Sequence, residues 1–91
     1  MNLRQLHYFR TLAKIEHYTQ AAAQLSITQP SLSHAITELE KELGVFLFEK
    51  QGRNIRLTKY GKIFLTYVDS ALCELEKGEK KIKKLFIIMM N

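Results

Sequence analysis

The sequence predicts a mainly helical fold, with three short helices, a two-stranded hairpin and a long last helix. Three observations predict it. Apolar residues recur every three or four positions along most of the chain, and capping residues stand ahead of these segments. A turn-forming stretch, residues 51–54, separates two brief apolar runs. The 91 residues suffice for one domain and an appended helix, so we expect a domain over 1–58 and a helix over 59–91.

The first two helices are expected to be short. Apolar side chains spaced by three, three and four residues predict a helix over about 3–14, with Asn2 as its N-cap. Residues 15–18 are expected to form a connector. Thr19 then caps a second helix that ends near Leu25, and its alanines, Ala22 among them, allow a neighbouring helix to approach closely.

The third helix is expected over 29–43. Thr28 is its N-cap, Pro30 lies in the first turn, where a missing N–H costs nothing, and Gly44 ends it. Its inner face carries Leu32, Ile36, Leu39 and Leu43. Two strands are expected next, over 46–49 and 55–57, and Thr58 then caps the long helix.

Positive charge is concentrated in one stretch. The formal net charge is +5, and residues 50–62 carry five basic residues and no acidic one. These are Lys50, Arg53, Arg56, Lys59 and Lys62. Such a stripe is typical of a surface that binds nucleic acid. It is equally typical of a solvated face of a small soluble protein, and charge alone does not separate the two.

The order of elements adds a second indication. A helix, a short helix, a tight turn, a longer helix and a basic hairpin form a winged helix-turn-helix. The outward face of the third helix carries no large aliphatic residue; it consists of Gln29, Pro30, Ser33, His34 and Thr37. Taken alone, residues 28–31 are more simply a helix cap. The turn before them and the basic hairpin after them favour contact with DNA.

Several segments, in order, resemble the N-terminal domain of LysR-type transcriptional regulators. They are 1–9 (MNLRQLHYF), 18–22 (YTQAA), 25–33 (LSITQPSLS), 39–40 with 43–45, 47–50 (LFEK), Arg53, and 57–58 with Gly61. Each segment is a weak signal alone, but the ordered set is specific and covers about residues 1–65. The resemblance implies a DNA-binding winged helix-turn-helix followed by a linker helix.

The resemblance also implies which residues contact double-stranded DNA. The implied set is Arg4, Thr28, Gln29, Pro30, Ser31, Ser33, His34, Thr37, Lys50, Arg53 and Arg56. Helix 29–43 would lie in the major groove, where the Gln29 amide can pair bidentately with adenine and Pro30 can contact a thymine methyl. Ser31 and Ser33 would hold phosphates or waters. The wing, 50–56, would lie at the minor groove, with Arg53 inserted and Lys50 and Arg56 on phosphates. Arg4 would touch the backbone or be a solvated surface residue.

Five residues depart from the family's pattern. His34 and Thr37 stand where many members carry basic residues, which lowers the fixed charge of the helix that reads the DNA. His34 would donate a hydrogen bond to DNA when protonated, or would form a hydrogen bond in one neutral tautomer. Glu16-His17 replaces a common Gly-Ser before the second helix, so a differently shaped turn is expected. Phe46 is apolar where members usually carry a polar residue, and we expect it either to form a contact surface or to add to the core.

The long helix carries a heptad-like seam. Its apolar positions step alternately by four and three: Phe64, Val68, Ala71, Leu75, Gly78, Ile82, Leu85 and Met89. The domain's own core can use the first two turns, Tyr60 and Phe64 especially. Beyond Leu72 no internal partner is expected, so we predict a homodimer through Phe64, Val68, Ala71, Leu75, Ile82 and Leu85. The resemblance implies antiparallel pairing and an interrupted inverted repeat as the target.

Other functions are disfavoured. There is no phosphate-binding Gly-rich loop and no plausible catalytic set, so an enzyme is not expected, and neither is a cofactor. The single cysteine, Cys73, and the scattered His7, His17 and His34 predict no metal site. No signal peptide is recognisable and the longest apolar run, 85–90, is too short for a bilayer. We expect a cytoplasmic, nucleoid-associated protein with no membrane partner.

Family members continue into an effector-binding domain that this sequence lacks. We therefore expect no small-molecule effector on this chain, and either constitutive DNA binding or competition with a full-length relative, mixed dimers included. The alternative from another class is a winged-helix protein–protein interaction module that acts by heterodimerisation with such a relative.

Overall fold

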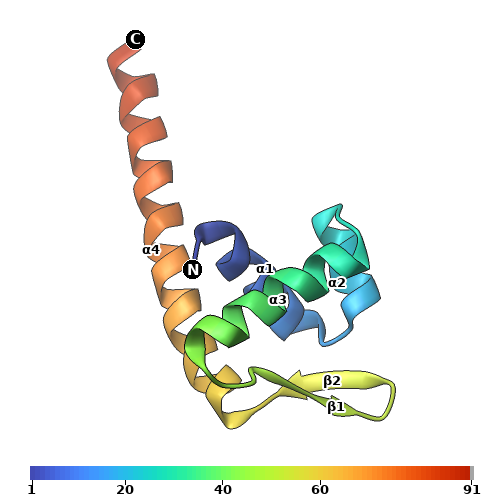
Figure 1. Cartoon of the computed structure of the whole chain (residues 1–91). Helices are drawn as coiled ribbons and strands as arrows, with labels where there is room; N and C mark the ends of the chain where they lie inside the picture. The colour runs from blue at the N-terminus through green and yellow to red at the C-terminus, as the bar shows by residue number, and fades with distance from the viewer. Residues whose placement is uncertain (91) are drawn as a thin grey trace.

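The computed structural model describes residues 1–90 and confirms the predicted fold class. Its elements are α1 (Leu3–Ile15), α2 (Tyr18–Leu25), α3 (Gln29–Leu43), β1 (Phe48–Gln51), β2 (Asn54–Leu57) and α4 (Lys59–Met90). Helices α1 to α3 form a body that α4 passes on one side and then leaves, and the hairpin extends from the base of the body, away from α4 (Figure 1).

Helix α1 begins as predicted, and α2 does not. Asn2 caps α1: its side-chain oxygen accepts from the Gln5 N–H at 2.8 Å, and the Gln5 side chain accepts from the Asn2 N–H at 3.2 Å. Helix α2 begins at Tyr18 with His17 as its N-cap, so the prediction of Thr19 was wrong. The His17 Nδ1 accepts from the Gln20 N–H at 3.2 Å, because an unprotonated ring nitrogen fills the role of a hydroxyl oxygen.

The turn into α3 and the end of α3 agree with the sequence. Thr28 caps α3 through its Oγ1, which accepts from the Ser31 N–H at 3.2 Å, and Gly44 ends the helix with φ of +77°. Two other helix ends use a left-handed residue that is not glycine, Glu16 and Ser26, each with φ of +58°. These conformations strain an ordinary side chain, which matches the unusual turn expected at Glu16.

The core is centred on Phe9. Its ring contacts those of Phe48 and Phe64 at centroid distances of 5.5 and 5.3 Å, so one side chain joins α1, β1 and α4. The largest fully buried side chains are Phe9, Leu12, Leu32, Ile36, Leu39, Leu47 and Leu72. Ala22 is also buried, where α2 meets the rest of the body, as predicted.

The first strand lies two residues later in the sequence than predicted. The two strands pair antiparallel with Phe48 opposite Leu57 and Glu49 opposite Arg56, and the loop is only Gly52-Arg53. Residues 46 and 47 are outside the ladder because other groups bind their backbone. The Thr58 hydroxyl donates to the Phe46 carbonyl at 2.6 Å, and the Thr58 N–H donates to the Leu47 carbonyl at 2.9 Å. Thr58 also caps α4, accepting from the Gly61 N–H at 3.1 Å.

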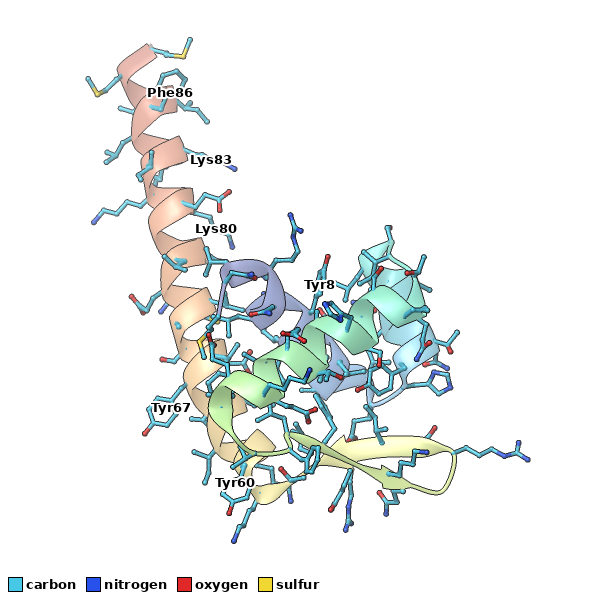
Figure 2. All side chains as sticks on the ribbon, in the orientation of Figure 1. Tyr8, Tyr60, Tyr67, Lys80, Lys83 and Phe86 are labelled. Atoms are coloured by element: carbon cyan, nitrogen blue, oxygen red, sulfur yellow. The ribbon has the colours of Figure 1, made fainter. Side chains whose placement is uncertain are left out.

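The face of α4 that stays exposed differs from the predicted seam. Val68 and Leu72 are 3% and 1% exposed, and Phe64 is half-buried, so Phe64 and Val68 serve the protomer's own core. Tyr60, predicted as core, is exposed and points away from the body, as does Tyr67 (Figure 2). One row of exposed positions at helical spacing, here called the α4 stripe, consists of Tyr60, Ile63, Tyr67, Ala71, Leu75, Gly78, Ile82, Leu85 and Met89. A straight helix of 3.6 residues per turn drifts from a 3.5-residue repeat, which explains the shift.

Two ion pairs join α1 to α4. The Arg10 guanidinium lies 2.9 Å from a Glu76 carboxylate oxygen, and the Lys14 ammonium lies 3.5 Å from Asp69. The hydrogen bond to Glu76 raises the pKa of Arg10, and the Arg10 side chain is mostly covered. Glu76 is the last α4 residue with a polar contact to the body, so the helix projects freely beyond it.

The pair predicts a pH-dependent stability. The hydrogen bond from Arg10 lowers the pKa of Glu76 in the folded state. A lowered pKa means that the contribution is complete above the unfolded pKa and is lost as the pH falls through the folded one. We therefore expect Glu76→Gln to melt at a lower temperature than wild type near neutral pH, with the two curves converging in acid. Glu38→Gln, whose carboxylate pairs only with Lys41 one turn along the same helix, is the control. Two curves that stay equally far apart down to full protonation would contradict this role.

Candidate nucleic-acid interface

The start of α3 presents a compact polar surface. Thr28, Gln29, Pro30 and Ser31 are all exposed in the first turn. His34 and Thr37 are exposed on the next turns, and Ser33 is half-buried. No ion pair within residues 1–90 involves any of them. Apart from Thr28 and Ser31, which bind each other, their side chains are free to contact a ligand. The structure thus brings the predicted major-groove residues together on one accessible end of a helix.

Two hydroxyls of this surface are arranged locally. The Thr28 hydroxyl donates to the Ser31 Oγ at 2.7 Å while its oxygen accepts from the Ser31 N–H. Thr28 is therefore occupied in capping the helix. The hydroxyl proton of Ser31 is not used in this contact, so it can donate outward, for example to a phosphate oxygen.

The wing presents its cations differently from the prediction. Arg53 lies in the two-residue loop at the tip and is exposed. Arg56 pairs across the strands with Glu49, Nε to Oε1, at 2.9 Å. Lys50 lies opposite Ile55, and neighbouring residues of a strand point to opposite faces, so Lys50 and Arg56 lie on opposite faces of the hairpin. They do not form one clamp around Arg53, and Arg56 carries a compensating charge beside it.

The wing is attached to the turn between α1 and α2. The Ile55 N–H donates to the Glu16 carbonyl at 3.4 Å. Glu16 has the left-handed conformation that ends α1, so the strained residue is also the one that accepts the hydrogen bond of the wing. This contact relates the position of the hairpin to that of the helix-turn-helix.

Arg4 is not brought to the same place. The N-terminal ammonium lies 2.6 Å from the Glu42 carboxylate, near the C-terminal end of α3. At 1.5 Å per residue Gln29 is about 20 Å from that end. Arg4 is exposed in the first turn of α1, three residues from that ammonium, so it lies toward the C-terminal end of α3.

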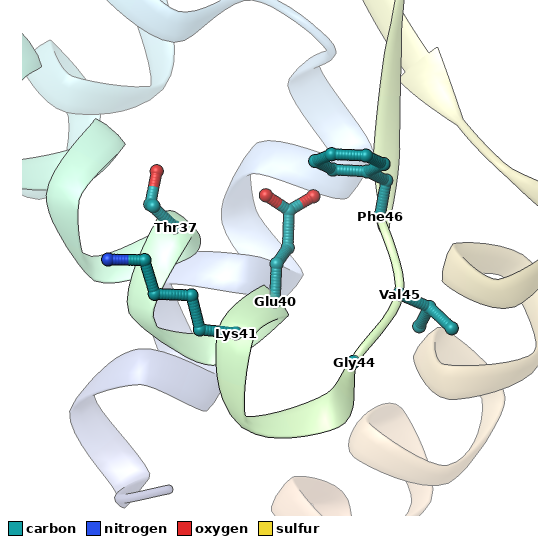
Figure 3. A pocket seen from close by; sticks show the side chains of 6 residues that line it. All are labelled: Thr37, Glu40, Lys41, Gly44, Val45 and Phe46. Atoms are coloured by element: carbon teal, nitrogen blue, oxygen red, sulfur yellow. The ribbon is translucent and has the colours of Figure 1, made fainter.

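One residue of the site was missed by the sequence analysis. The Glu40 carboxylate accepts from the Leu47 N–H at 2.7 Å and from the Phe48 N–H at 3.4 Å. Figure 3 shows its side chain pointing from α3 toward the segment that carries Phe46. Burial, with the charge of Glu40 nearby, raises the pKa of Tyr18. Phe46 itself is 75% exposed, so it is not core. Glu40 therefore fixes the strand that leads into the wing.

We expect Glu40→Ala to destabilise the fold by about 2 kcal/mol, because two backbone N–H groups lose their acceptor. Glu40→Gln keeps an acceptor oxygen and is expected to cost less than half of that. Chemical denaturation of the three proteins measures the difference. Equal stability of the alanine and glutamine variants would show that the hydrogen bonds contribute nothing.

Among residues 1–90, no helix is long and apolar enough to cross a membrane. No group of three or more His, Cys, Asp or Glu side chains in that range is arranged to hold a metal ion.

Comparison with known proteins identifies close relatives. The chain is 51% identical over 85 residues to an HTH-type transcriptional regulator, YybE, of Bacillus subtilis (strain 168), which covers 93% of this chain and 29% of the relative. It is 45% identical over 82 residues to the transcriptional dual regulator GltC of the same organism, covering 90% and 27%. The chain thus spans under a third of the length of these relatives.

Solved structures share the fold. The BenM DNA-binding domain in complex with catB site 1 DNA superposes with a TM-score of 0.87 at 36% identity, covering 92% of this chain and 93% of that one. The CbnR DNA-binding domain in its DNA complex gives a TM-score of 0.84 at 32% identity, covering 91% and 95%. The profile of the family described as "Bacterial regulatory helix-turn-helix protein, lysR family" matches residues 3–62. By its motifs, its winged helix-turn-helix and these matches, the chain belongs to the lysR family of bacterial regulatory helix-turn-helix proteins.

Proposed function

We propose that the protein is a transcriptional regulator that binds double-stranded DNA, with the start of α3 in the major groove and the wing at the minor groove. The observation that carries this proposal is the likeness of 92% of the chain to a domain solved in complex with DNA. The exposed, unpaired residues of the α3 start support it, since such a surface leaves base contacts free.

Within this proposal the residues divide by role. Gln29 and Pro30 read base edges, and His34 and Thr37 extend the same face. Ser31 and Ser33 hold phosphates. Arg53, at the wing tip and without an ion pair among residues 1–90, enters the minor groove. Lys50 contacts the phosphates of the DNA backbone from one face of the hairpin. Arg56 contributes less to phosphate binding, because Glu49 offsets its charge.

The protein acts as a homodimer on an interrupted inverted repeat in this proposal. The α4 stripe supports it, because a long row of exposed apolar residues on one helix needs a second apolar surface. The contact set is amended relative to the sequence-based prediction. Tyr67 replaces Val68 and Ile63 replaces Phe64, while Ala71, Leu75, Ile82 and Leu85 remain.

A titration against two duplexes at several salt concentrations tests the proposal. One duplex holds an interrupted inverted repeat from upstream of the protein's own gene, and the other is shuffled. We expect binding to fall steeply with salt, because released counterions drive it. Arg53→Ala is expected to flatten the slope of log affinity against log salt by about 2, because each copy of the dimer loses one cation. Gln29→Ala is expected to reduce the preference for the repeat by about tenfold, because a bidentate base contact is lost.

The matched control is Lys84→Ala, which removes an exposed cation from the far part of α4. It is expected to leave both the salt slope and the sequence preference unchanged. Binding to neither duplex at low salt by a correctly folded dimer would refute the proposal, and would favour the protein–protein interaction module instead.

A further inference from the structure

We propose that His17 is a positioning residue for DNA binding, which holds α2 and the wing in place only while its imidazole is neutral. This inference rests on the proposed function and deepens it, because it makes the arrangement of the DNA-binding surface depend on pH. The role differs from that of His34, the exposed histidine on the outward face of α3.

The half-buried His17 ring caps α2 in one protonation state only. Its Nδ1 accepts from the Gln20 N–H at 3.2 Å, so Nδ1 has to keep its lone pair and the single ring proton stands on Nε2. Protonation adds a hydrogen to Nδ1, so that two donors face each other and the Gln20 N–H loses its acceptor. The positive charge of the imidazolium also adjoins the first N–H groups of α2, which form the positive end of the helix dipole.

Nothing else replaces this cap. The His17 carbonyl already accepts from the Ala21 N–H at 2.9 Å, and among residues 1–90 no other side chain accepts from the first turn of α2. Helices α1 and α3 are capped by Asn2 and Thr28, whose side chains do not titrate. Of the three helices of the body, α2 is therefore the one whose first turn responds to a proton.

His17 also stands where the helix-turn-helix meets the wing. Its neighbour Glu16 has φ of +58°, and the Glu16 carbonyl accepts from the Ile55 N–H of the wing at 3.4 Å. Figure 1 shows the turn between α1 and α2 beside β2. A polar hollow between the two parts is lined from both sides, by Glu16, His17, Gln20, Gln51, Asn54 and Ile55. Loss of the cap therefore loosens the start of α2 and the backbone contact of the wing together.

The charges around His17 do not restore the cap. Glu16 is the one other titratable residue that lines the hollow, and the wing contributes only neutral side chains to it. The Glu16 carboxylate attracts an imidazolium, but it does not return a lone pair to Nδ1. Burial raises the pKa of Tyr18, the next residue of α2, so its hydroxyl stays neutral. The cations nearest in sequence do not line the hollow; they are Lys14, Lys50 and Arg53.

The expected effect of acid is opposite to the general one. A falling pH adds positive charge to a protein, which strengthens its attraction to DNA phosphates. Protonation of His34 acts in that direction, because it adds a charge and a donor to the face of α3. Protonation of His17 acts against it. The cap's contribution to stability is complete while the imidazole is neutral, and it is lost as the pH falls through the range in which histidines are protonated.

Thermal unfolding without DNA tests the cap. Between about pH 7.5 and about pH 5.5, the melting temperature of wild type is expected to fall by about 5 °C more than that of His17→Asn, because asparagine caps a helix without titrating. His17→Ala, which has no cap, is expected to melt about 5 °C below His17→Asn at both pH values. All variants are melted at one protein concentration. His34→Asn is the matched control, and it is expected to keep the pH dependence of wild type.

Titration against the inverted-repeat duplex at fixed salt tests the positioning role. The affinity of wild type relative to that of His17→Asn is expected to fall about threefold over the same pH change, at a temperature where both proteins are folded. His34→Asn is expected to show the same fall relative to a His17→Asn/His34→Asn double variant.

Equal pH dependence in wild type and His17→Asn, in the melts or in the affinities, overturns the proposal. So does a His17→Ala variant as stable as His17→Asn, since the ring then caps nothing. Failure of the proposed function looks different: a folded protein that binds neither duplex at either pH refutes the function, and with it the role of His17 in DNA binding. A duplex that is bound with the same pH dependence by wild type and His17→Asn refutes only the role of His17.

Discussion

Gly61→Ala is expected to lower the stability of the protein by about 3 kcal/mol, because the added methyl group would collide with the backbone of Leu47, which cannot move aside as a side chain can. A Cβ at Gly61 would overlap the Leu47 carbonyl oxygen and lie 2.8 Å from Leu57 Cδ2. The Leu47 carbonyl is fixed by the hydrogen bond from the Thr58 N–H at 2.9 Å. The first turn of α4 would have to move away from the wing. The melting temperature is expected to fall by about 15 °C.

Gly78→Ala is the matched control, since it makes the same chemical change in the same helix. There the added Cβ meets no atom of the protomer within 4 Å, and alanine favours a helix, so the melting temperature of the monomer is expected not to fall. Both variants are melted at a concentration low enough to keep the chain monomeric, because Gly78 lies in the α4 stripe and dimers melt in a concentration-dependent way. A Gly61→Ala variant as stable as wild type would mean that α4 and the wing can separate without cost.

Local signals predicted most of the fold. Asn2, Thr28 and Gly44 mark helix ends through groups only a few residues away, so the chain itself carries that information. His17 is local as well, yet histidine is an uncommon cap and the more usual Thr19 stands two residues later. That error came from a residue preference rather than from tertiary structure.

The hairpin and α4 depend on contacts that are distant in sequence. Residues 46 and 47 read as strand, but Thr58 and Glu40 bind their backbone and delay the ladder. Along α4 several apolar rows are present, and the row that is buried depends on where α1 and β1 lie against the helix. Val68 and Tyr67 are neighbours in the sequence, yet Val68 is 3% and Tyr67 is 70% exposed, and that difference depends on which side of α4 the body covers.

The candidate site divides in the same way. The α3 residues could be predicted as one surface because a single helix carries them at helical spacing. The charge distribution of the wing could not be predicted, because the strand register places Arg56 opposite Glu49, which compensates its charge. A two-residue loop at Gly52-Arg53, in place of the expected four-residue turn, would have predicted that Glu49 and Arg56 face each other.

Leu85→Glu is expected to convert the dimer to a monomer and to reduce affinity for a duplex with two half-sites by at least about 100-fold, since the second half-site then gains no effective concentration. Leu85 is 52% exposed and far from the body, so the winged helix-turn-helix should fold unchanged. Sedimentation gives the mass, and titration against duplexes with one or two half-sites gives the affinities.

Ser70→Glu is the matched control, because it adds the same charge at an exposed α4 position outside the stripe. It is expected to remain dimeric and to bind the two-half-site duplex nearly as wild type does. Affinity for a single half-site should be equal in both variants, since neither position lies near α3 or the wing. If Leu85→Glu loses that affinity as well, added negative charge rather than lost pairing is the cause. If it stays dimeric, the α4 stripe is not the dimer contact, and the two reading helices must be related through another surface.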